Sequence, residues 1–204
     1  MSEIAAAISA FGNFVMAFAA IAAAVVAANG LSTWKKQGLW QRDTELAKNL
    51  FLKLRSRSDA FIELRVRMVT SGEMVAALER SFDPFDPKEK DAAYLAAINK
   101  RMIALQERRR EMYPDVVEAT AVWGGAIESL SKQLATLETK VLFAHQDVSE
   151  LSGNSHLPRS ASEQLKTDRS VAFGTKDDST GTAYFELVEK IEELLREKLH
   201  GGRT

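Results

Sequence analysis

A long run of uncharged residues near the N-terminus constrains this chain more than any other feature. From Ile4 to Thr33 there are 30 consecutive positions without Asp, Glu, Lys or Arg. An α-helix needs only about 20 apolar residues to cross a hydrocarbon layer of about 30 Å. No Lys or Arg precedes the run, and it is longer than the apolar region of a secretory signal peptide. We therefore expect a transmembrane helix; the alternative is a buried alanine-rich helix in a soluble core.

The distribution of charge predicts which way this helix is oriented. Of 27 basic and 28 acidic side chains, only Glu3 lies within the first 33 residues. Trp34, Lys35 and Lys36 follow the run and have the composition of an anchor in the lipid headgroup layer. Residues 34–67 contain nine basic and four acidic side chains, which would also attract anionic lipids. Because cytoplasmic flanks are enriched in Lys and Arg, we expect the N-terminus outside and the rest of the chain in the cytoplasm.

One face of the uncharged run consists of small residues. Positions 6, 10, 13, 17, 20, 24 and 27 share a face of a helix, and all are alanine except Asn13. Small residues let two helices approach closely, and an asparagine amide in lipid favours a hydrogen bond to its neighbour. The sequence thus predicts a homo-oligomer in the membrane, with a small-residue face formed by Ala10, Asn13, Ala17, Ala20 and Ala24. Alternatively, the alanines, twelve of the first 33 residues, align by chance.

The remainder of the chain shows apolar stripes with helical spacing. Within residues 41–80 the stripe runs from Ala47 to Leu78, and eight of its ten positions are apolar, with Arg57 and Ser71 as exceptions. It predicts one helix, which the prolines at positions 84 and 87 end.

A second stripe extends from Leu95 to Leu151 and has a single fault in its spacing, close to Pro114. It predicts either one kinked arm over residues 88–151 or two helices that meet end to end. A third stripe begins near Tyr184 and ends at Leu199, while residues 159–173 are ambiguous and could contain one short helix.

These stripes predict an all-α fold with three parts. Residues 1–33 form the transmembrane anchor, and residues 34–151 form a long antiparallel helical hairpin with a basic start. Residues 152–204 provide a linker and an amphipathic C-terminal helix that packs on the hairpin. The product would be a bundle of three or four helices, because each apolar stripe needs a partner and short connections favour antiparallel neighbours.

The sequence contains no recognisable catalytic, cofactor-binding or metal-binding motif. There is no cysteine, and His145, His156 and His200 lack a second ligand at helical spacing. The loop at 174–181 lacks the Lys-Ser/Thr ending of a phosphate-binding loop, and acids flank the basic run at 108–110. Because these motifs are absent, we expect no enzyme activity and no cofactor. A net charge of −1 also predicts no nucleic-acid partner.

Several short motifs resemble an uncharacterised family of bacterial proteins. Thr-Trp-Lys-Lys-Gln at 33–37 is followed by Glu-Leu-Ala-Lys-Asn-Leu at 45–50. Asn-Lys-Arg at 99–101 and Val-Trp-Gly at 122–124 are similar to the middle of that family. Its members have one N-terminal membrane span and a cytoplasmic helical, coiled-coil domain. The resemblance implies an anchored helical protein of the bacterial inner membrane and implies no activity.

Two functional hypotheses follow. The first is a membrane-anchored interaction module, a scaffold, sensor or adaptor whose helical body binds a protein partner not yet identified. The alternative is an oligomer that perturbs the bilayer, such as a holin-, toxin- or defence-like effector, and it would assemble through the small-residue face.

Overall fold

The structure, a computed structural model, describes residues 2–152, 158–174 and 178–200. Within these ranges every regular element is an α-helix, so the predicted all-α class is confirmed. The chain divides into two compact units, residues 1–45 and residues 46–204. Each unit is described by itself.

The first unit contains the N-terminal part of helix α1 (Ser2–Arg65). The backbone remains helical at Asn29 and Gly30, where the apolar run ends. The Thr33 hydroxyl donates a hydrogen bond of 3.0 Å to the Asn29 carbonyl one turn earlier, as is common for threonine inside a helix.

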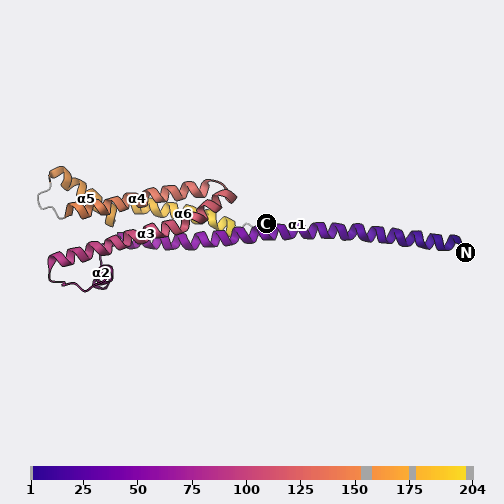
Figure 1. Ribbon diagram of the computed structural model, residues 1–204. Helices are drawn as coiled ribbons and strands as arrows, with labels where there is room; N and C mark the ends of the chain where they lie inside the picture. The colour runs from indigo at the N-terminus through magenta and orange to yellow at the C-terminus, as the bar shows by residue number, and fades with distance from the viewer. Residues whose placement is uncertain (1, 153–157, 175–177, 201–204) are drawn as a thin grey trace. The chain divides into compact units, whose positions relative to one another are not determined.

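The second unit contains residues 46–65 of α1 and five further helices within the described ranges. These are α2 (Ser71–Leu78), α3 (Pro87–Trp123), α4 (Ala126–Ser152), α5 (Arg159–Phe173) and α6 (Ser179–His200). Helices α3 and α4 lie side by side and antiparallel, and α6 runs antiparallel to α4 (Figure 1). Helix α5 packs on α4, and α2 packs on α3.

The predicted apolar stripes meet in one core. It contains residues from α1, α3, α4 and α6, among them Leu50, Leu54, Phe61, Leu105, Met112, Leu134, Val141, Ile191 and Leu195. A smaller cluster joins α4 to α5 through Ala144, Val148, Leu165 and Ala172. Burying a Leu or Ile side chain contributes about 1.5–3 kcal/mol, so these stripes hold the second unit together.

The first long helix ends at Arg65, so the prediction of one helix through residue 80 is wrong. Residues 66–70 leave the helix, and Thr70 caps α2 by accepting the Glu73 backbone N–H at 3.2 Å. Beyond Arg65 the predicted stripe no longer faces the core, and Met68 and Val75 are exposed. The Thr-x-x-Glu pattern at 70–73, typical of a helix start, was the sequence signal for this break.

The predicted arm over residues 88–151 is also interrupted, but not at Pro114. Helix α3 continues through Pro114, whose ring removes only one backbone donor, and it ends at Trp123. Gly124 adopts a φ of 92°, a region that favours glycine, and its N–H donates to the Thr120 carbonyl at 3.0 Å. Helix α4 then turns back along α3, so both predicted alternatives for residues 88–151, one kinked arm and two helices that meet end to end, are wrong.

Candidate functional site

Large apolar side chains lie uncovered along the first unit. Phe18, Ile21, Val26 and Trp34 are between 64% and 71% exposed. Among the described residues, α1 is the one helix that is long and apolar enough to cross a membrane by length and composition. None of its most apolar 18-residue stretch is buried. The core helix of a soluble protein passes the same test of length and composition, but such a helix is mostly buried.

The residues of the predicted small-residue face lie on this uncovered helix. Asn13, Ala17, Ala20 and Ala24 are exposed, while the side chain of Ala10 lies outside the described part of the structure. The anchor residues Trp34, Lys35 and Lys36 are exposed as well. Self-association through this face stays a prediction.

Four of the nine basic residues at 34–67 form ion pairs within the second unit. Lys53 pairs with Asp115, Arg55 with Glu192, Arg57 with Glu138 and Arg65 with Asp178. These four side chains hold helices together. The predicted orientation of the apolar helix therefore depends on the basic residues nearest to it, which are Lys35, Lys36, Arg42 and Lys48.

A buried ion pair joins α1 to α4 in the middle of the core. The Arg57 Nε and Nη2 groups donate to the two carboxylate oxygens of Glu138 at 2.7 and 2.8 Å, and both residues are 1% exposed. The Tyr184 hydroxyl of α6 donates to Glu138 Oε1 at 3.3 Å, and Arg57 Nη1 lies 3.7 Å from Met112 Sδ of α3. Burial and the charge of Glu138 raise the pKa of Tyr184, so this hydroxyl keeps its proton.

Arg65 connects the last turn of α1 to the start of α6. Its guanidinium donates to both carboxylate oxygens of Asp178 at 2.6 and 2.8 Å, and to the Val171 carbonyl at 3.2 Å. The bonds from Arg65 lower the pKa of Asp178, partly against its burial. Asp178 also accepts the Gly181 N–H at 2.9 Å. A Cβ at Gly181 would overlap the side chains of Asp178 and Arg65, so a larger residue at this helix start would have to displace their ion pair.

Arg101 of α3 closes the C-terminal end of α1. It donates to the backbone carbonyls of Glu63, Val66 and Met68 at 2.9, 2.6 and 3.0 Å. It also forms an ion pair with Glu73 of α2. A helix end leaves carbonyls without helical partners, and here one guanidinium from a distant helix binds the Glu63 carbonyl in the last turn of α1 and two carbonyls of the segment that follows it.

His145 of α4 is buried near these two arginines. It is 2% exposed, and its Nε2 has no hydrogen-bond partner. Burial lowers the pKa of His145 from 6.5 to about 4, and Arg65 and Arg101 add to the shift, although the Ala172 and Leu64 backbone opposes it. The imidazole is therefore neutral at pH 7. It packs as a core side chain, as the apolar stripe around it predicts.

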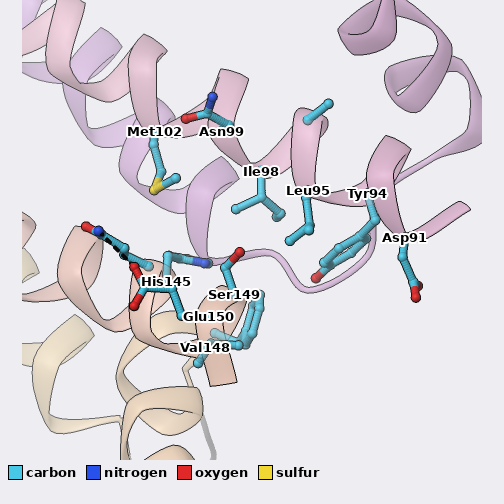
Figure 2. Close-up of a pocket in the computed structure, with 13 residues that line it drawn as sticks. Asp91, Tyr94, Leu95, Ile98, Asn99, Met102, His145, Val148, Ser149 and Glu150 are labelled. Carbon is cyan, nitrogen blue, oxygen red and sulfur yellow. Dashed lines mark hydrogen bonds between the residues drawn. The ribbon is translucent and has the colours of Figure 1, made fainter. Parts of the chain in front are cut away.

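An open groove lies between α3 and α4 (Figure 2). Its first hollow, of about 710 Å³, is lined by side chains that include Asp91, Tyr94, Leu95, Ile98, His145, Ser149 and Glu150. A second hollow adjoins it along α3 and is lined by Ile103, Arg109, Arg110, Tyr113 and Phe143, among others. Asn99, Met102 and Gln146 line both hollows, so the two adjoin, and together they are called the groove below.

The residues that line the groove do not form a recognisable catalytic arrangement. Across the described ranges, no group of three or more His, Asp or Glu side chains is placed to hold a metal ion. The only histidine in the groove wall is His145, which is neutral and packed. The lining combines apolar side chains with polar and charged ones, which suits the groove to binding.

Comparisons with protein-family models, with curated proteins and with solved structures found no match for the chain. The resemblance to a family of anchored bacterial proteins therefore stays a prediction.

Removing one partner of the buried ion pair should be costly. Glu138→Ala leaves the Arg57 guanidinium buried without its counterion and should lower the free energy of unfolding by about 3–5 kcal/mol. Thermal unfolding followed by circular dichroism in mild detergent measures this change.

The matched control replaces both charges with apolar side chains. Arg57→Met combined with Glu138→Leu should recover most of the loss, because apolar pairs of similar volume often substitute for buried ion pairs. A double variant as unstable as Glu138→Ala alone would show that the loss does not come from an unpaired charge.

Acidification should destabilise the second unit through His145. The pKa of this group in the folded chain, about 4, lies below the ordinary 6.5. The unfolded state therefore binds the proton first as pH falls. Stability should be constant above about pH 6.5 and decline towards pH 4, by as much as about 3 kcal/mol.

His145→Leu removes this titration and serves as the comparison. Melting temperatures of the two chains, measured every half pH unit, should diverge between pH 6.5 and 4. Asp178 affects stability in a different pH range. Because its pKa is lowered from 3.8, protonation of Asp178 destabilises the chain only below about pH 3.8. Parallel curves for both chains between pH 6.5 and 4 would contradict the prediction.

Proposed function

We propose that this protein is a membrane-anchored interaction module. Residues 4–33 cross the lipid bilayer of a bacterial inner membrane, with the N-terminus outside. The second unit lies in the cytoplasm and binds another protein. The observation that carries the proposal is an 18-residue apolar stretch of α1, none of which is buried within the described residues.

The membrane is the environment that best suits this stretch. An exposed apolar patch on a soluble protein rarely exceeds a few hundred Å², whereas here every described side chain from Met16 to Leu31 is exposed. The 30 uncharged residues exceed the length of one span, which leaves room for tilt. The adjoining Trp34, Lys35 and Lys36 have the chemistry of the headgroup layer.

The second unit supports a binding role. Three arginines, Arg57, Arg65 and Arg101, fasten α1, α2, α3, α4 and α6 together through charged hydrogen bonds. A preorganised scaffold of this kind loses little conformational entropy when it binds a partner. The open groove between α3 and α4 gives this scaffold a surface with an apolar floor.

Charges placed inside the run test the anchor. Ile21→Arg with Val25→Arg should release the chain from membranes, because each Arg near the centre of a span costs about 3 kcal/mol and alanine contributes little. The measurement is the fraction that stays in the membrane pellet after carbonate extraction. Leu52→Arg with Ile62→Arg alters two exposed side chains of the second unit and should leave the chain in the pellet.

Orientation is read in the same cells. A fluorescent reporter that folds only in the cytoplasm, fused after Thr204, should be active, and a phosphatase that needs the periplasm should be silent. The reverse result would overturn the orientation. Extraction of the unaltered chain by carbonate would overturn the anchor itself.

The small-residue face provides a separate test of self-association. Asn13→Ala should weaken dimerisation of the full chain in a bacterial membrane about threefold, because hydrogen bonds between helices in lipid average about 0.6 kcal/mol. Phe18→Ala, on another side of the same helix, should change it little. A monomeric unaltered chain, or a larger effect of Phe18→Ala, would leave a plain anchor.

A further inference from the structure

We propose that the groove between α3 and α4 binds one amphipathic helix of a partner protein in a defined direction. The N-terminal end of the partner helix lies at Asp91 and Glu150, and its C-terminal end lies at Arg109 and Arg110. The proposal rests on the proposed binding function and specifies the chemistry of the partner.

The length of the groove favours a helix. On α3 the lining residues extend from Asp91 to Tyr113 and recur every three or four positions. At about 1.5 Å per residue this distance is about 33 Å, or six helical turns. A small molecule of drug size would fill only one of the two hollows, whereas a helix lying in the groove contacts both.

The groove also carries the large side chains that anchor helices. Leu95, Ile103, Tyr113 and Phe143 line it and are between 42% and 67% exposed. Leu95 lies on the apolar stripe of α3, yet α4 leaves it partly open. Single exposed apolar residues are ordinary, but four in one groove provide the aromatic and aliphatic contacts typical of interface hot spots.

Charge at the two ends sets the direction. The first hollow is lined by the acids Asp91 and Glu150 and by no Lys or Arg, and Gln146 holds Glu150 through a hydrogen bond of 3.2 Å. The second hollow is lined by Arg109 and Arg110 and by no Asp or Glu. A helix carries about half a positive charge at its N-terminus and half a negative charge at its C-terminus. The groove is therefore complementary to a helix that runs parallel to α3.

The test selects helices on the full-length chain in lipid nanodiscs. A displayed library of 20-residue amphipathic helices with random charges is selected against the unaltered chain. Enriched peptides should carry Lys or Arg in their first turns and Asp or Glu in their last turns. Phe143→Ala should weaken them at least about tenfold, as expected of a hot-spot side chain. Phe85→Ala changes a phenylalanine that is 91% exposed outside the groove, and it should have no effect.

Charge reversal tests the direction independently. Arg109→Glu with Arg110→Glu should weaken the selected peptides several-fold and favour peptides of reversed charge order. Arg108→Glu, next to the groove but not lining it, is the matched control. Because the chain has no cysteine, a peptide with an N-terminal cysteine should form a disulfide with Ser149→Cys and not with Gln106→Cys.

Several results would overturn the proposal. These are no enrichment over the Phe143→Ala chain, the opposite charge order among enriched peptides, and equal disulfide formation at both cysteines. If the groove binds only a second copy of this chain, the chain will form dimers. Phe143→Ala will dissociate these dimers, whereas the displayed peptides will not. Carbonate extraction reports on the anchor alone, so failure of the groove and failure of the membrane assignment are distinguishable.

Discussion

The ion pair between Arg57 and Glu138 constrains how α1 and α4 pack in the core of the second unit. Two full charges, each 1% exposed, are stable in an apolar core only when their hydrogen bonds are satisfied. That condition requires α1 and α4 to be in one register and brings Tyr184 of α6 to the same carboxylate. Phe61 then stacks on Tyr184 with ring centroids 3.6 Å apart. Apolar stripes alone would tolerate sliding between helices, whereas this bidentate contact does not.

Arginines with several hydrogen bonds also connect the ends of the helices. Arg101 binds carbonyls of the last turn of α1 and of the segment after it, and Arg65 binds the acid that starts α6. Both sites pair a planar donor with several oxygens, which lysine could not do equally well. His145 is buried near enough for both arginines to lower its pKa, although burial is the larger cause. Stability of the second unit is therefore coupled to pH through one neutral side chain.

The two units differ in how much of their apolar surface is buried. The second unit covers its stripes with its own helices, and the groove between α3 and α4 remains open. In the first unit, none of the most apolar 18-residue stretch of α1 is buried among the described residues. An interaction module anchored in a bilayer would satisfy both conditions: lipid covers the first surface and a protein partner occupies the second.

The sequence alone determined the helical class, the uncharged run and the buried face of each long helix, because these depend on local spacing and composition. It indicated Arg57 as a charge within an apolar stripe, but not its partner Glu138, which is 81 residues away. Only the tertiary structure placed the breaks at residues 66–70 and at Gly124, assigned Arg101 to the end of α1 and opened the groove. The break at 66–70 has a local signal in the Thr-x-x-Glu pattern at 70–73, whereas the contacts of Arg101 and the groove depend on distant segments, about which local periodicity carries no information.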